Sequence, residues 1–437
     1  MQKVNINGLP ALFLLANSIS WFSLTMLAIG DIANAKDLLS VHPLLIASAY
    51  FGGLIGSAAI GATILQRSFR SKSFLSGWVF FGVVTCLLFS YWAATDAISL
   101  TLKSLLLGLS AGAGIPACFS FFGYLTKIEK RGKAGAIMFF IVQVFTVAVL
   151  LSATGIDTQH EFLILAIWRL IGISGALFYK PVQSQSKEYL TSLKSIIRER
   201  TFLLYFLPWF LFTLINFIES PIIEKFFGQS LYDISVLATT IISSISAIVA
   251  GILCDLKGRK VTGIIGFVLL GLSYAILSFF SGEIPKYLYI LFDGVAWGIL
   301  FVNFIFVLWG DLSEEKIREK YYLLGSLPFL LSGMIEILIK PFIENINMDS
   351  TRFTSFFFPF ASFFLFLAIV PLLYATETLP EKAMKDRDLK SYLEKAQKIA
   401  KGRTSSKKGT NQKDDQPENT QESAEDKKAR ELAEKYY

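Results

Sequence analysis

The sequence predicts an all-α integral membrane protein in which twelve transmembrane helices form two six-helix halves. Three observations lead to this prediction: the composition, the length of the apolar runs and the charge of the segments between them. Of 437 residues, 53% are hydrophobic and only 17% are charged, whereas soluble domains carry about 25% charged residues. The apolar runs reach about 20 residues, and at ~1.5 Å per residue such a helix crosses a ~30 Å hydrocarbon core.

We predict twelve such spans. Their ranges are 9–31, 42–65, 74–94, 99–124, 134–155, 161–179, 202–223, 233–254, 261–281, 286–309, 321–343 and 353–374. The first span is too long for the apolar core of a signal peptide, so we expect it to be retained. The three cysteines, Cys86, Cys118 and Cys254, lie far apart in the sequence, and we expect neither a disulfide framework nor a metal site or cofactor.

The connectors alternate in charge. Those after spans two, four, six, eight and ten are rich in Lys and Arg, whereas the others carry mainly Asp and Glu. By the positive-inside rule the basic set is cytoplasmic, which predicts a multi-pass cell-membrane protein with both termini in the cytoplasm. The formal charge of +7 does not indicate nucleic-acid binding, because the basic residues sit at span ends.

The longest internal connector separates six spans from six, which indicates an internal repeat. We therefore predict an N-terminal half (1–179), a cytoplasmic linker (180–200), a C-terminal half (201–374) and a charged cytoplasmic tail (375–437). Apolar residues at helical spacing predict an amphipathic helix over 380–401 of the tail. The polar residues of 402–424 are typical of disorder.

A short basic turn closes span eight. Gly251 lets this span approach a neighbour closely, and Asp255 stands where an acid can face the positive N-terminus of another helix. Gly258 permits the turn, and we expect Arg259 and Lys260 to anchor it at the lipid headgroups. The turn resembles the loop signature G-x-x-x-D-x-x-G-R-K of the major facilitator superfamily of secondary transporters.

The resemblance implies a conformational latch. In the superfamily the acid docks on a helix of the opposite half when the cytoplasmic side is closed, so Asp255 is expected to meet the start of span five, near Gly132 to Gly135. The equivalent turn of the first half, 61–70, has Leu65 in place of the acid. We therefore expect a latch in the second half alone, with Asp255 as its one charged element.

Four acids fall near the outer ends of different spans: Asp293, Glu336, Glu219 and Asp31. Ionisable groups are costly in hydrocarbon and usually mark a pathway. Asp293 has no charged neighbour at helical spacing, so we expect it to be a proton acceptor or a cation ligand. Glu336 has the alternative of pairing with Lys340 one turn away, and Glu219 and Asp31 have the alternative of lying in water.

Further polar and aromatic residues complete the predicted site. Arg169 of span six is either a structural anchor or a substrate clamp, and Trp168-Arg169 resembles a pair common in the superfamily. The superfamily fold implies a central cavity lined by spans one, four, seven and ten. Its candidate lining residues, each of which has helix packing as the alternative, are Asn17, Trp21, Gln143, Asn216, Trp297 and Asn303. Aromatic bodies with a few polar groups suit a small organic substrate.

The function predicted from these features is secondary transport of a small organic solute by alternating access, coupled to protons. The sequence lacks H-E-x-x-H and phosphate-loop motifs, so we expect neither an enzyme nor an ATP-driven pump. The expected partners are the solute, protons and the lipid bilayer, and the expected state is a monomer. A transporter-like sensor or scaffold that signals through its tail is the alternative, and import of sugars or organic acids and export of drugs or metabolites both remain open.

Overall fold

The computed structural model describes residues 9–34, 43–63, 72–92, 96–153, 155–178, 192–280, 282–346 and 350–380. Within these ranges every regular secondary-structure element is a helix, and twelve helical segments are long and apolar enough to cross a membrane. The predicted all-α fold with twelve transmembrane helices is therefore confirmed.

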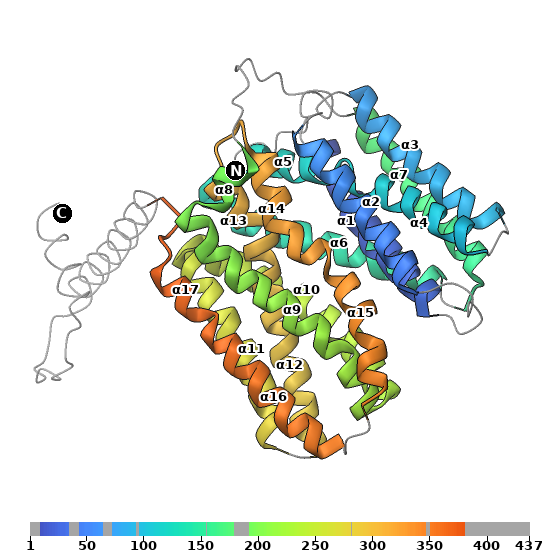
Figure 1. The fold of residues 1–437 in the computed structure, drawn as a ribbon. Helices are drawn as coiled ribbons and strands as arrows, with labels where there is room; N and C mark the ends of the chain where they lie inside the picture. The colour runs from blue at the N-terminus through green and yellow to red at the C-terminus, as the bar shows by residue number, and fades with distance from the viewer. Residues whose placement is uncertain are drawn as a thin grey trace, which may run out of the picture. The chain divides into compact units, whose positions relative to one another are not determined.

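Six spans make up the first part of the chain (Figure 1). Their elements are α1 (Leu9–Asn34), α2 (Pro43–Thr63), α3 (Lys72–Tyr91), α4 (Ala97–Gly112), α5 (Ile115–Leu125), the 3₁₀ turn η4 (Ile128–Lys130), α6 (Arg131–Ala153) and α7 (Thr158–Phe178). Span four is divided into α4 and α5 because Pro116 lies in the first turn of α5 and cannot donate a backbone hydrogen bond to a continuous helix. The Asp96 carboxylate caps α4 by accepting from the Ser99 N–H at 3.0 Å, and hydrogen bonds from the Ser99 side chain and backbone lower the pKa of Asp96.

The short helix α8 (Leu193–Ile197) falls in the predicted linker, and six further spans follow it. Their elements are α9 (Arg200–Phe227), α10 (Gln229–Lys257), α11 (Arg259–Phe279), α12 (Glu283–Phe301), the π-helix η5 (Val302–Val307), α13 (Leu308–Leu312), α14 (Arg318–Leu330), α15 (Ser332–Glu344), α16 (Ser350–Leu367) and α17 (Ile369–Tyr374). Span ten thus runs through α12, η5 and α13, and the π-helix shifts the faces that its two ends present.

The two sets of six spans meet along α6 and α10. Gly132 of α6 and Gly251 of α10 lie at this contact, and a Cβ atom added to Gly251 would stand 2.5 Å from the carbonyl oxygen of Gly132. Only residues without a side chain permit such an approach, which is how small residues bring membrane helices together. The close approach expected of Gly251 therefore occurs against the opposite half.

Residues Met1–Thr378 form one compact unit, and Leu379–Tyr437 form a second. The predicted tail helix (380–401) and disordered segment (402–424) lie outside the described residues, which end at Pro380. Residues 64–70 of the first-half turn also lie outside them, so the expected one-sidedness of the latch stays a prediction.

Candidate functional site

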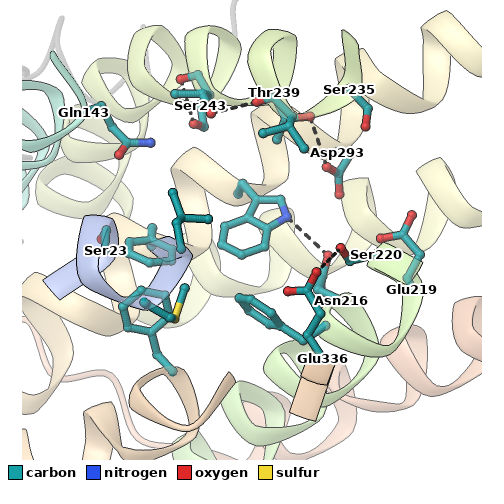
Figure 2. Close-up of a pocket in the computed structure, with 18 of the residues that line it drawn as sticks. Ser23, Gln143, Asn216, Glu219, Ser220, Ser235, Thr239, Ser243, Asp293 and Glu336 are labelled. Carbon is teal, nitrogen blue, oxygen red and sulfur yellow. Dashed lines mark hydrogen bonds between the residues drawn. The ribbon is translucent and has the colours of Figure 1, made fainter. Parts of the chain in front are cut away.

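A cavity of about 310 Å³ lies between the two halves. The first half contributes residues of α1 and α6, and the second half contributes residues of α9, α10, α12, α14 and α15 together with Phe306 of η5. Six of the residues predicted from the sequence line this cavity, five of which are labelled in Figure 2: Gln143, Asn216, Glu219, Asp293, Trp297 and Glu336.

The three cavity carboxylates receive hydrogen bonds from hydroxyl groups. The Tyr289 hydroxyl donates to Glu219, the Ser220 hydroxyl donates to Glu336 at 2.8 Å, and the Thr239 hydroxyl donates to Asp293 at 3.4 Å. The second carboxylate oxygen of Asp293 is buried and has no hydrogen-bond partner among the described residues.

The structure departs from the sequence-based alternatives for Glu336 and Glu219 and agrees with the alternative for Asp31. Lys340 donates to both oxygens of Glu224, at 2.9 and 3.1 Å, rather than pairing with Glu336. Glu219 is 6% exposed, so it is not a surface acid in water. Asp31 is exposed at the end of α1 and is not part of the cavity lining.

Asn216 and Trp297 form a fixed part of the cavity wall. The side-chain oxygen of Asn216 accepts from the Trp297 indole at 3.2 Å and from the Tyr274 hydroxyl at 3.3 Å. Its amide nitrogen donates to the Phe212 carbonyl at 2.9 Å. Because the Asn216 amide is engaged by protein groups on both sides, it orients the indole.

Three predicted cavity residues, Asn17, Trp21 and Asn303, do not line the cavity. Asn17 and Trp21 face the interior of the first half, whereas Ile19 and Ser23 of the same helix face the cavity. Residues two apart on a helix point about 200° away from each other, so the predicted face of α1 was wrong. Asn303 lies in η5 and donates to the Arg259 carbonyl at 3.0 Å, away from the cavity.

Arg169 of α7 is fully buried inside the first half and is also absent from the cavity lining. Its guanidinium lies between the rings of Trp21 and Trp78, 4.5 and 4.4 Å from their centroids, and donates to Asn17 at 3.0 Å and Ser18 at 3.1 Å. These contacts tie α7 to α1 and α3, and the guanidinium gains from the two ring faces. They favour the structural anchor over the substrate clamp.

Four phenylalanines form an aromatic floor at the cavity: Phe22 and Phe139 of the first half, and Phe301 and Phe329 of the second. All but Phe22 line the cavity directly. The ring centroids of Phe139 and Phe301 are 5.2 Å apart, those of Phe22 and Phe329 are 5.7 Å apart, and those of Phe301 and Phe329 are 4.8 Å apart. The rings interlock across the two halves at the ~4.5–7 Å spacing that aromatic pairs prefer. This layer is not predictable from the sequence, because the chain has 40 phenylalanines and their spacing does not show which rings meet.

Polar contacts join the two halves at the end of the helix bundle where Asp255 lies. The Asp255 carboxylate accepts from the backbone N–H of Gly132 at 2.8 Å and of Lys133 at 3.0 Å, in the first turn of α6. A carboxylate at a helix N-terminus satisfies free N–H groups and is favoured by the helix dipole. The contact lies at the start of span five, where pseudo-symmetry places the partner of Asp255.

The expectation that Asp255 is the only charged element at this end was wrong. Asp311 of α13 pairs with Arg131 of α6 through one oxygen and with Arg259 of α11, at 2.6 Å, through the other. The three side chains are 5% exposed or less. An acid at the end of span ten, where the positive-inside rule expects basic residues, was the sequence signal that could have identified Asp311.

One of the two expected headgroup anchors, Arg259, lies elsewhere. Arg259 is fully buried rather than at the lipid surface, because its guanidinium is held by Asp311 and by the Cys254 carbonyl at 2.7 Å. Lys260 donates to the Leu373 carbonyl at 2.6 Å. The Glu377 carboxylate accepts from the N–H of Arg259 at 2.8 Å and of Lys260 at 3.1 Å, so it caps the N-terminus of α11. Gly258 immediately precedes this helix with a φ of +97°, a conformation that favours glycine.

A family model described as Major Facilitator Superfamily matches residues 9–321, which is most of the chain. The chain belongs to the Major Facilitator Superfamily. None of the curated proteins compared with the sequence is a significant match.

Solved structures of other Major Facilitator Superfamily transporters share the fold. The human organic anion transporter MFSD10 matches with a TM-score of 0.62 at 12% identity, over 84% of this chain and 98% of that one. The proton:xylose symporter XylE bound to 6-bromo-6-deoxy-D-glucose matches with a TM-score of 0.59 at 13% identity, over 86% and 96%. A double-tryptophan variant of XylE matches with a TM-score of 0.65 at 12% identity, over 87% of this chain and 97% of that one. At such low identities the likeness shows a multi-pass transporter fold and does not extend to the solute.

Proposed function

We propose that this superfamily member is a secondary active transporter that moves a small organic solute by alternating access and couples the movement to protons. The observation that carries the proposal is the cavity between the halves, with the aromatic floor beside it and the Asp255 contacts joining the halves at one end. Rocking of the halves about a central site opens such a cavity to one side or the other. The structure then represents the state in which the Asp255 end is closed.

The contacts at the Asp255 end have the strength that a reversible latch requires. Hydrogen bonds to charged groups contribute about 1.5–3 kcal/mol each, and Asp255 accepts two from α6. Two-state proteins have conformations separated by a few kcal/mol. A latch of this size holds one state without preventing the other.

We assign to Asp293 the uptake and release of the coupled proton. It is 5% exposed, lines the cavity and has one oxygen without a hydrogen-bond partner among the described residues. A buried carboxylate without a counter-charge is stabilised when it takes up a proton. Its protonation would change with the side of the membrane to which the cavity opens.

Orientation follows from the charges of the connectors. The Asp255 end carries the basic connectors, such as Lys257, Lys260 and Lys133, so we place it in the cytoplasm. The cavity then opens to the outside in this state, both termini are cytoplasmic, and the transporting unit is one chain because both cavity walls come from it.

The proposal is tested with purified protein in proteoliposomes. Labelled sugars, organic acids, amino acids and amines are offered with and without a pH gradient across the membrane. We expect one class to accumulate with the gradient and to leak out when a protonophore collapses it. Transport of no class, or accumulation that is the same without the gradient, contradicts the proposal.

A further inference from the structure

We propose that the cavity binds an organic cation, with its charged end against the acids of the second half and its apolar body against the first half. The inference rests on the proposed transport function and names the class of solute that is carried.

The ionisable side chains at the polar wall of the cavity are carboxylic acids without a basic partner in the lining. Among the described residues that line it, Glu219, Asp293 and Glu336 are acids and none is Lys, Arg or His. The lysines on α9 and α15 are engaged elsewhere: Lys340 pairs with Glu224, and Lys225 donates to three backbone carbonyls at 2.7–2.9 Å. An anionic solute would meet only like charge, whereas a cation finds complementary charge.

The three carboxylates have hydroxyl partners but no positive counter-charge within hydrogen-bond distance. Hydroxyl groups orient a carboxylate without neutralising it. Asp293 lines the cavity and is 5% exposed, and one of its carboxylate oxygens has no hydrogen-bond partner among the described residues. Because an uncompensated charge is costly away from water, a bound cation stabilises this wall.

The hydroxyl groups of the lining reinforce the negative character. Ser23, Ser235, Thr240 and Ser243 donate to carbonyls of their own helices, at 2.7–3.1 Å. Their protons are therefore engaged within the protein, and their oxygen atoms remain available as hydrogen-bond acceptors. Such a wall favours a ligand that donates hydrogen bonds or carries positive charge.

The lining is also polarised between the two halves. All three acids come from α9, α12 and α15 of the second half. The first half contributes Ile19, Met26, Leu27, Phe139 and Val142 together with Ser23 and Gln143. Figure 2 shows Ser23 and Gln143 across the cavity from Glu219 and Asp293. A ligand with a charge at one end and an apolar body at the other matches this arrangement.

Aromatic rings and the cavity size favour an organic rather than a metallic cation. Trp297, Phe301 and Phe329 line the cavity, and aromatic faces attract ammonium groups. Within the described residues no three acidic, His or Cys side chains converge in a way that could hold a metal ion. A volume of about 310 Å³ lies at the lower end of the ~300–1,000 Å³ range of small-molecule sites.

The test compares three probes of similar shape: benzyltrimethylammonium, neutral N,N-dimethyl-2-phenylacetamide and anionic phenylmethanesulfonate. Binding to the purified full-length protein in detergent is measured by calorimetry. We expect saturable binding of the ammonium probe alone. We expect Glu219→Gln and Glu336→Gln each to weaken its affinity about tenfold or more.

Both variants keep the shape of the side chain, and a Gln oxygen can still accept from Tyr289 or Ser220. Glu336 is only partly buried, so its variant gives a second measurement if Glu219→Gln does not fold. The matched control is Glu283→Gln, which removes an acid of α12 that is exposed, pairs with Lys286 and does not line the cavity. This control should bind the ammonium probe like the unmodified protein.

Equal affinity for the amide or the sulfonate, or unchanged ammonium binding in both carboxylate variants, overturns the inference. Counterflow of the labelled probe in proteoliposomes distinguishes a failure of the cation site from a failure of the transport proposal. Carboxylate-dependent binding without counterflow supports the cation site and contradicts transport. Counterflow of a neutral or anionic solute, with no binding of the ammonium probe, supports transport and overturns the cation site.

Discussion

The backbone N–H of Gly132 donates to the Asp255 carboxylate at 2.8 Å, and these two residues belong to opposite halves of the protein. Gly132 can occupy this position because it has no side chain: a Cβ there would stand 2.6 Å from the same carboxylate. The contact therefore depends equally on the acid of α10 and on the glycine of α6. It forms only when the two helices are close.

Replacing Gly251 with valine should prevent the Asp255 end from closing. The new Cβ would meet the Gly132 carbonyl oxygen at 2.5 Å and the Ala136 Cβ at 2.6 Å, and both are held on α6. Overpacking of this kind costs about 1–3 kcal/mol, which shifts a two-state equilibrium about 5- to 150-fold. The measurement is the rate at which native Cys254, buried beside Gly132, reacts with a polar thiol reagent.

Gly56→Val is the matched control, because a Cβ at Gly56 of α2 has no atom within 4 Å. It should leave the Cys254 labelling rate unchanged. A Gly251→Val protein that labels no faster than this control would show that the close helix contact does not keep the end closed.

Replacing Asp311 with alanine should lower the stability of the closed state by about 3–5 kcal/mol, since it leaves two buried arginines without their partner. Asp311 bridges Arg131 and Arg259, and all three side chains are buried. The check is thermal unfolding of the purified protein, with Asp233→Ala, an exposed acid of α10, as the control. Equal melting temperatures for the two variants would contradict the assignment.

Asp293→Asn should abolish proton-driven accumulation of the solute but leave counterflow largely intact. Asparagine keeps the shape of the side chain and cannot exchange a proton at neutral pH. Uptake by the variant should therefore lose its dependence on the pH gradient. Proteoliposomes that still accumulate the solute in response to a pH gradient would exclude Asp293 as the proton carrier.

The fold was predictable because long apolar runs and alternating connector charge depend on the membrane rather than on tertiary contacts. The acids of the cavity were found for the same reason, since a carboxylate such as Asp293 in a span is conspicuous against apolar neighbours. The position of the Asp255 contact followed from the resemblance of its turn to a family signature.

The other features of the site depend on tertiary contacts, which the spacing of residues along the sequence does not reveal. The sequence shows that Asn17 and Trp21 share a face of α1, but not that this face meets α7 while Ile19 meets the cavity. Asn303 lies in the π-helix, so it faces a different direction from the one that regular α-helical spacing predicts. Arg259 follows a glycine in a basic turn, which is also the pattern of a surface residue, and its burial depends on Asp311 from another span.

The proposed mechanism requires that the cavity and the Asp255 end open in alternation. Two thiols are labelled in separate proteins, each with a single cysteine. The first protein lacks Cys86 and Cys118 and keeps native Cys254 at the Asp255 end. The second lacks all three native cysteines and carries the thiol introduced by Ser235→Cys in the cavity wall. In detergent the reagent reaches both ends. We predict that Asp255→Ala speeds labelling of Cys254 and slows labelling at position 235. If both rates rise together, or if neither changes, the two ends are not coupled and alternating access is contradicted.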